Sequence, residues 1–320
     1  MGMFVVLLVH AECSLGPVTF YGGMFCMPVF FVASGYTCRQ KEGETYRDYI
    51  KKKAQKLLGA YFGTSALLWL FFWLKDSVLT GRFTDLKLRS VFGIFYSRNQ
   101  MFTAQYTGEN PVLMDILNAP LWFLTAMFLT YAWYGIVSRC KRKYLLLVLG
   151  VAASIIWHYS TSLLLPWSLE AIPLYTCFFV SGVILRQKKK EELLGELWFL
   201  GVLLVVFLIT SQLSGTENLS RGNYGNSIII CLFAGTTGSW LVFAVGMWLE
   251  RVYPPIMKLF TAAGQETLLI LCSHMFLFML IRTGAAFLGF GPVLTTVVLV
   301  AGGFVLPTGI GKILHGRSRR

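Results

Sequence analysis

Charged residues are scarce in this sequence. Asp, Glu, Lys and Arg make up only 13% of its 320 residues, whereas 56% are hydrophobic and 15% are aromatic. An ordinary soluble domain carries roughly a quarter charged residues. So few charges could not cover the surface of a water-soluble fold of this length. The shortage predicts an integral membrane protein without a sizeable soluble domain.

Several signals of other protein classes are also missing. The seven cysteines have no CxxC spacing, so the sequence indicates neither a zinc site nor a redox pair. No internal repeat, low-complexity segment or cleavable signal peptide is recognisable. The net charge of +13 falls mostly in short connections between apolar runs. That pattern favours membrane orientation over nucleic-acid binding, and we expect no metal ligands and no nucleic-acid partner.

Long apolar runs are what the sequence does contain. A helix needs about 20 apolar residues to cross a bilayer, and runs this long and uniform exclude the alternating strands of a barrel. We therefore predict an all-α, polytopic membrane helix bundle of about ten helices, forming one domain over residues 1–320. The predicted spans are Met1–Ala11, Gly22–Cys38, Gly59–Leu74, Ala119–Ser138, Tyr144–Tyr159, Trp167–Leu185, Trp198–Leu213, Ser227–Leu249, Thr267–Leu288 and Pro292–Ile313.

The distribution of positive charge tests this topology. Of the 28 Lys and Arg residues, 21 fall in connections on one side, six fall on the other, and Arg282 lies inside a span. Connections rich in Lys and Arg remain in the cytoplasm. We expect both termini to be cytoplasmic, in a cell membrane such as the bacterial inner membrane.

Two connections are longer than turns. Residues 44–58 have the apolar periodicity of an amphipathic helix with a basic face. This face suits either anionic lipid headgroups or the phosphates of a ligand at the cytoplasmic mouth of a cavity. Residues 75–118 form a long outer stretch, which either covers an acceptor site or is a variable loop.

Two of the four histidines, His10 and His274, lie in apolar runs. Ionisable groups in a membrane are costly and usually face a cavity or a partner, and imidazole suits proton transfer near neutral pH. A plain interhelical hydrogen bond is the simpler explanation. Glu12 either orients the His10 imidazole or faces the outer water, since residues two apart on a helix do not face each other.

Several separated pieces of the chain occur in one characteristic order. They are Leu7-Leu8-Val9-His10, Met27-Pro28-Val29-Phe30-Phe31 with Ser34-Gly35-Tyr36, Tyr49-Ile50-Lys51-Lys52-Lys53 with Lys56-Leu57-Leu58 and Tyr61, Leu121-Trp122-Phe123-Leu124, and Gly264-Gln265-Glu266-Thr267-Leu268 before His274. Together with ten spans, these pieces resemble the acyltransferase family 3 membrane proteins, which include sugar O-acetyltransferases of the fucose 4-O-acetylase type.

The resemblance implies a reaction and a set of site residues. The acyl donor is usually acetyl-CoA, a co-substrate bound from the cytoplasm, with no tightly bound cofactor. The acceptor is a hydroxyl of a carbohydrate or lipid-linked glycan at the outer face. The essential histidine of the first span corresponds to His10, and Ser34 to Tyr36 match a family feature near the donor path. The family usually carries Arg or Lys about eleven residues before that histidine, a position that would precede Met1.

A mechanism follows from the charges. Coenzyme A is anionic, and a basic cluster would hold its nucleotide end while the pantetheine arm reaches inward. The members of this cluster are Arg39, Arg47, Lys51, Lys52, Lys53 and Lys56. His10 would act as general base towards the acceptor hydroxyl, or as a transient acetyl carrier. Trp122 is a candidate for stacking on a sugar ring, and His274 for a second polar contact.

Two other classes of function stay open at the level of sequence. One is a transporter or flippase without covalent chemistry, which the same kind of helix bundle would serve. The other is a sensor or structural membrane protein that kept the fold and lost catalysis.

Overall fold

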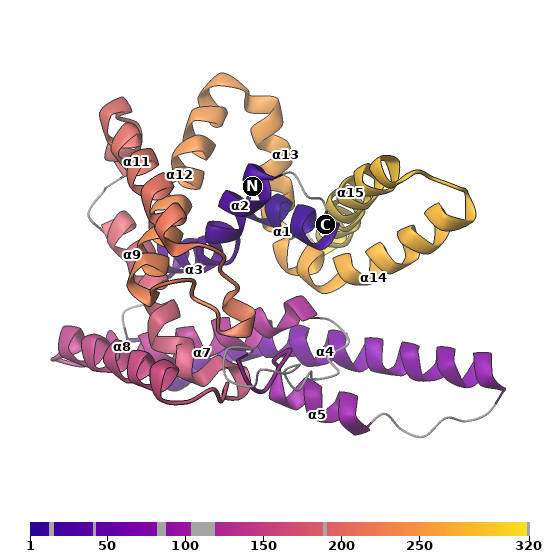
Figure 1. Ribbon diagram of the computed structural model, residues 1–320, viewed down its shortest axis with the longest axis horizontal. Helices are drawn as coiled ribbons and strands as arrows, with labels where there is room; N and C mark the ends of the chain where they lie inside the picture. Colours follow the sequence, from indigo (N-terminus) through magenta and orange to yellow (C-terminus); the bar gives the residue numbers. More distant parts are fainter. Residues whose placement is uncertain (13–15, 41–42, 82–87, 104–118, 188–190, 319–320) are drawn as a thin grey trace. The chain divides into compact units, whose positions relative to one another are not determined.

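The computed structural model describes residues 1–12, 16–40, 43–81, 88–103, 119–187 and 191–318 (Figure 1). These residues are predominantly helical, and the only β pairing among them is two isolated bridges, Phe102 with Leu163 and Asn218 with Asn223. The predicted all-α class is confirmed.

Eight of the described helices are long and apolar enough to cross a membrane, and nine are if a bent pair counts as one span. The protein is therefore a multi-pass membrane protein, as predicted. The predicted first span corresponds to α1 (Gly2–His10), whose nine residues are too few to cross the hydrocarbon core by themselves. This short helix accounts for the difference from ten.

The predicted second span is that bent pair. It consists of α2 (Pro17–Cys26) and α3 (Pro28–Thr37), which meet at an angle of 41°. Pro28 has no backbone N–H to continue the hydrogen bonds of α2, so the helix is interrupted at that residue.

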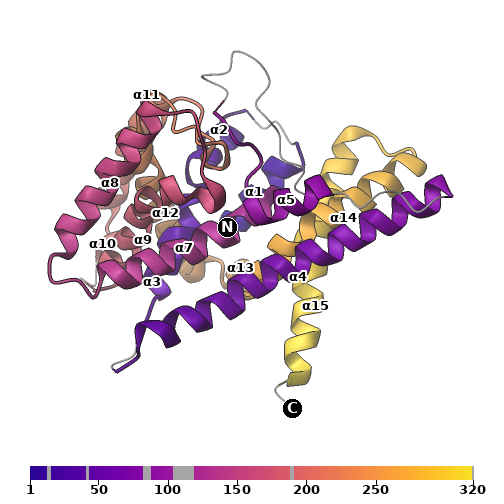
Figure 2. The same ribbon diagram turned by 90° about the horizontal axis from the view of Figure 1, so that it is seen from below.

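Helix α4 (Tyr46–Thr80) joins two elements that were predicted separately, the amphipathic helix of residues 44–58 and the third span. The Thr45 hydroxyl accepts a hydrogen bond from the Asp48 N–H at the start, and Gly81 ends the helix with a φ of 64°. Its 35 residues extend about 52 Å, and Figure 2 shows them as one uninterrupted rod. A bilayer core takes up about 30 Å of such a helix, so the basic end is a rigid continuation of a span.

The remaining helices mostly follow the predicted spans within a few residues. They are α5 (Leu88–Tyr96), η1 (Ala119–Leu121), α7 (Trp122–Val137), α8 (Lys143–Ser160), η2 (Pro166–Ala171), α9 (Ile172–Gln187), α10 (Glu191–Leu194), α11 (Leu197–Ser214), η3 (Leu219–Arg221), α12 (Ile228–Val252), α13 (Pro254–Gln265), α14 (Thr267–Phe287) and α15 (Pro292–Ser318). Helix α13 begins where a plain connection was predicted. In the predicted outer stretch, residues 82–87 and 104–118 lie outside the described residues.

The chain divides into two compact units. Unit 1 contains Met1–Thr37, Val180–Glu217 and Tyr224–Arg320, and unit 2 contains Cys38–Phe179 and Asn218–Asn223. Within unit 1, α11 packs on α12 and α14 packs on α15, while α4 packs on α7 within unit 2. A single domain for the whole chain stays a prediction.

Close packing in unit 1 depends on a glycine of α15. A Cβ atom on Gly303 would lie 2.7 Å from Cε1 of Phe278 and 3.2 Å from Cδ2 of Leu7. The absence of a side chain at this position lets α14 and α1 both approach α15 closely. The end of α1 is thereby held against α14.

Candidate functional site

Two histidines meet in unit 1. His10 is the last residue of α1 and is half-buried, whereas His274 on α14 is fully buried. Their ring centroids are 5.3 Å apart and their planes are tilted by 51°. Phe278 packs against His274, with the two rings perpendicular and their centroids 5.8 Å apart. The sequence predicted both residues as candidates, and the structure makes them neighbours.

The protonation of the neutral His274 ring follows from its hydrogen bonds. Nδ1 lies 3.0 Å from the carbonyl oxygen of Ile270 and 3.1 Å from that of Leu271. Because carbonyl oxygens only accept, Nδ1 carries the proton and Nε2 has the lone pair. Nε2 is buried, and no hydrogen-bond partner for it exists in the part of the chain that the structure describes.

Glu12 does not orient the His10 ring in this structure. Its backbone is left-handed, with a φ of 58°, and its carboxylate accepts a hydrogen bond from Nη1 of Arg282 at 3.2 Å. Arg282 also donates from Nη2 to the His10 carbonyl oxygen at 3.4 Å. Among the described residues, no hydrogen bond joins Glu12 to the imidazole. Arg282 was recognisable in the sequence as an ionisable residue inside an apolar run.

The predicted donor-path segment lies on α3. Ser34 and Tyr36 are half-buried, and the Tyr36 ring packs edge-on against Phe243 at 5.4 Å. The Tyr36 carbonyl accepts a hydrogen bond from Nη1 of Arg186 at 3.4 Å. Gly182 approaches the Val32 carbonyl so closely that a Cβ atom would collide with it. These contacts show α3 closely packed on its neighbours, and a role of Ser34 and Tyr36 near the donor stays a prediction.

The six predicted phosphate-binding cations, all in unit 2, differ in their surroundings. The Lys52 ammonium forms an ion pair with Glu44 at 2.6 Å. The Lys53 ammonium is half-buried and lies 4.0 Å from the centre of the Tyr131 ring, a cation–π contact. The other four are exposed and form no ion pair within the described ranges; they are Arg39, Arg47, Lys51 and Lys56. Of the six, these four therefore present a charge that no described acidic residue neutralises.

Tyr46 and Tyr49, on one face of α4, pack against α7. A Cβ atom on Gly135 would lie 3.0 Å from the ring of Tyr46 and 3.1 Å from that of Tyr49. The Arg139 guanidinium lies over both rings, at 5.6 and 5.5 Å. Because these tyrosines hold one face of α4 against α7, Arg47 and Lys51 remain exposed on another.

Trp122, the candidate for sugar stacking, begins α7 and is only 4% exposed. Its ring lies 6.3 Å from that of Phe123 and 6.2 Å from that of Tyr175, in the core of unit 2. Stacking on a sugar requires an accessible ring face, so this role stays a prediction.

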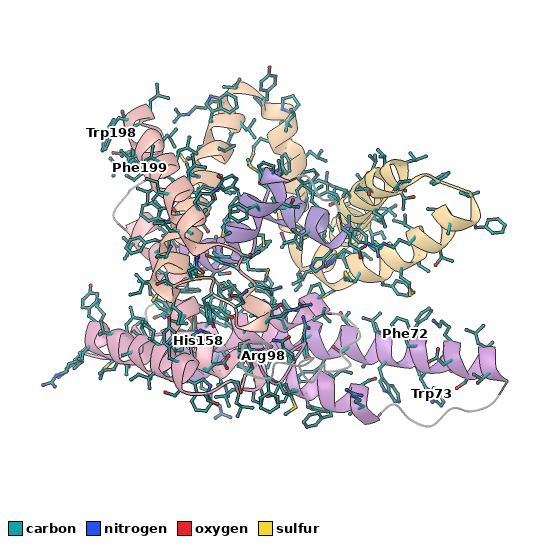
Figure 3. All side chains as sticks on the ribbon, viewed as in Figure 1. Phe72, Trp73, Arg98, His158, Trp198 and Phe199 are labelled. Atoms are coloured by element: carbon teal, nitrogen blue, oxygen red, sulfur yellow. The ribbon has the colours of Figure 1, made fainter. Side chains whose placement is uncertain are left out.

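Unit 2 contains a buried ion pair that was not predicted from the sequence. Arg98 is labelled in Figure 3. Its guanidinium is fully buried and binds the carboxylate of Glu170, whose side chain is 6% exposed. The other oxygen of Glu170 accepts the Leu165 N–H at 3.1 Å. Between these residues, Trp167 and Ser168 have φ values of 58° and 61°, a conformation that costs free energy outside glycine. No sequence spacing signals a pair 72 residues apart.

The phenol of Tyr96 lies beside this ion pair and donates to the Leu164 carbonyl oxygen. Burial raises the pKa of the Tyr96 phenol, and the nearby charge of Arg98 opposes the shift. Across the described ranges, no group of three or more His, Cys, Asp or Glu side chains is arranged to hold a metal ion.

Comparison with known proteins gave one match. A family model described as an acyltransferase domain matches residues 2–312, which is nearly the whole chain and includes both His10 and His274. No curated protein and no solved structure matches the chain.

Proposed function

Because this chain belongs to the acyltransferase 3 family of membrane proteins, we propose that it transfers an acetyl group from acetyl-CoA to a hydroxyl of an envelope carbohydrate or lipid-linked sugar. The observation that carries the proposal is the half-buried His10 imidazole at the end of α1, beside a second imidazole. A side chain that takes up and returns a proton near neutral pH is what ester formation at a hydroxyl requires.

In this proposal the acceptor oxygen attacks the thioester carbonyl while His10 removes the hydroxyl proton. The C–S bond then breaks, and the coenzyme A thiolate takes the proton from the His10 imidazolium. General-base assistance of this kind contributes about 10²–10⁴ in rate. In the alternative route, His10 first carries the acetyl group as an acyl-imidazole, which the acceptor hydroxyl then attacks.

The basic end of α4 would bind the phosphates of coenzyme A. Three exposed cations that form no ion pair within the described residues lie along it, Arg47, Lys51 and Lys56, and Arg39 lies just before it. Phosphate oxygens form strong charge-assisted hydrogen bonds with Arg and Lys. A rigid helix that continues a span also holds these charges beyond the hydrocarbon core. The proposal places both chain termini and this end of α4 in the cytoplasm, where the donor is made.

The double variant K51A/K56A is expected to raise the KM for acetyl-CoA about 100-fold or more, because each of the two charge-assisted hydrogen bonds contributes about 1.5–3 kcal/mol. The KM for the acceptor should change little. Steady-state kinetics with each substrate varied in turn measure both constants. K141A/R142A is the matched control, since it removes the same charge from the exposed connection before α8. An unchanged donor KM, or an equal rise in both variants, would favour lipid binding by α4.

The proposed function is tested with the purified protein in lipid vesicles, supplied with radiolabelled acetyl-CoA and an envelope glycan fraction. Label should enter the glycan as an ester that mild base removes, with one coenzyme A released for each ester formed. NMR of glycans from cells with and without the gene should show ester-linked acetyl signals only in the former. Absence of ester in both experiments would refute the proposal, and movement of an unmodified glycan across the vesicle membrane would indicate a transporter.

A further inference from the structure

A general base works best when a second group holds its ring in one orientation. The sequence offered Glu12 for this task, but its carboxylate binds Arg282 instead. We infer that His274 is the positioning partner of His10, with its Nε2 accepting a hydrogen bond from the His10 ring N–H. This inference rests on the proposed function and deepens its account of the site.

The distance between the rings fits such a hydrogen bond. An imidazole nitrogen lies about 1.2 Å from its ring centre, so facing nitrogens of rings 5.3 Å apart come to about 3 Å, which is hydrogen-bond distance. The bond is not formed in this structure, where Nε2 of His274 has no partner among the described residues and the two ring planes are tilted by 51°. Rotation about χ2 of a histidine is soft, and half-buried His10 is the ring with room to turn.

The roles of donor and acceptor are set by the anchored ring. Both carbonyl contacts of His274 are on Nδ1, so in its neutral form only Nε2 is left, and it can only accept. A buried acceptor without a donor costs free energy, so the site favours any N–H that reaches it. Within the described residues, His10 is the aromatic neighbour of His274 that carries such a group and has no other hydrogen bond to its ring.

The surrounding packing keeps the two rings together. Phe278 covers the His274 ring, and Gly303 lets both Phe278 and Leu7 of α1 approach α15. Because Leu7 lies one turn before His10 on α1, this contact sets the distance between the end of α1 and α14.

The proton balance of the reaction is unchanged by this arrangement. The hydroxyl proton moves to the free nitrogen of His10 and later to the coenzyme A thiolate. The N–H on the other ring nitrogen stays on His10 and donates to His274 throughout. His274 therefore stabilises the transient imidazolium as a neutral acceptor and does not become protonated.

Two substitutions of His274 separate this role from packing. In H274N the amide N–H can still donate to the Ile270 carbonyl, but no acceptor remains at the Nε2 position. In H274Q the longer amide offers an oxygen near that position. We expect kcat to fall about 10- to 100-fold in H274N, the range for a hydrogen bond to a charged group, with both KM values unchanged and a substantial recovery in H274Q.

The matched control is S273A, which removes another side-chain hydrogen bond to a carbonyl of α14, that of Ser273 to Leu269 at 2.8 Å. It should keep the kcat of the unaltered protein. A purely structural His274 predicts the opposite order, with H274N at least as active as H274Q, and that order would overturn the inference.

A second readout does not depend on turnover. With ¹⁵N-labelled histidine, the four rings of the full chain are separable by NMR after assignment with H10A, H158A and H274N. His274 is expected to be protonated on Nδ1, with an Nε2 signal that shifts when His10 is replaced. Protonation on Nε2 would refute the inference even in an active enzyme. If the unaltered protein transfers no acetyl group, the proposed function fails whatever the tautomer.

Discussion

Replacing His10 by alanine is expected to abolish acyl transfer while the protein still inserts into the membrane and purifies normally. The loss should be at least 10²–10⁴-fold, the contribution of a general base, and larger if His10 carries the acetyl group. His10 is half-buried at a helix end, so its removal creates little cavity. Release of coenzyme A in vesicles measures the activity, and gel filtration in detergent measures the folded state.

The matched control for this prediction is H158A. His158 is also half-buried and also lies in the last turn of a helix, α8, but it belongs to unit 2. Its replacement should leave the rate unchanged. A fully active H10A variant would remove His10 from the mechanism, and equal losses in both variants would indicate a general effect of removing imidazoles.

The same experiment separates the two proposed chemical routes. If His10 carries the acetyl group, radiolabelled acetyl-CoA should label the protein when no acceptor is present, and H10A should not be labelled. If His10 acts only as a base, neither protein is labelled, yet H10A is still inactive. Rapid quenching followed by gel electrophoresis detects the difference.

The second large effect is expected in unit 2, where R98A should strongly destabilise the fold. The substitution leaves the Glu170 carboxylate buried without its guanidinium partner. Breaking a buried ion pair on one side costs about 3–5 kcal/mol, because the remaining charge is uncompensated. Thermal unfolding in detergent, followed by circular dichroism, should show a marked fall in the midpoint.

A double variant tests this explanation. R98L/E170L removes both charges, and we expect it to be more stable than R98A, since no isolated charge remains. K52A is the control for a pair whose cation is in solvent, because the Lys52 side chain is 62% exposed although that of Glu44 is 9% exposed, and its midpoint should fall much less than that of R98A. If R98A unfolds at the same temperature as K52A, the buried pair does not stabilise unit 2.

The helices could be predicted well because membrane crossing is a local property of sequence. A run of apolar residues long enough to span the bilayer specifies a helix wherever it packs. The ninth predicted span, Thr267–Leu288, agrees with α14 to within one residue.

The errors in the predicted helices have local causes too. Residues 44–58 and the third span differ in composition, yet nothing breaks the backbone hydrogen bonds between them in α4. Helix α13 begins with Pro254 and Pro255 inside the predicted connection, since proline is well suited to the first turn of a helix.

The predicted site was harder to specify, as the basic cluster shows. The predicted basic cluster included Lys51, Lys52 and Lys53 on the basis of their charge alone. The structure distinguishes them, because Glu44 engages Lys52 and the Tyr131 ring engages Lys53. Such differences depend on residues that folding brings close, and no local pattern encodes them.

The sequence by itself determined that this is a helical membrane protein with two imidazoles in apolar surroundings, because hydropathy and residue chemistry act along the chain without reference to neighbours in space. Only the tertiary structure decided that these imidazoles meet, that Glu12 turns to Arg282, and that Arg98 and Glu170 are buried together. Each of these outcomes depends on which helices pack side by side, and close packing depends on contacts between distant residues, such as those of Gly303 with Phe278 and Leu7.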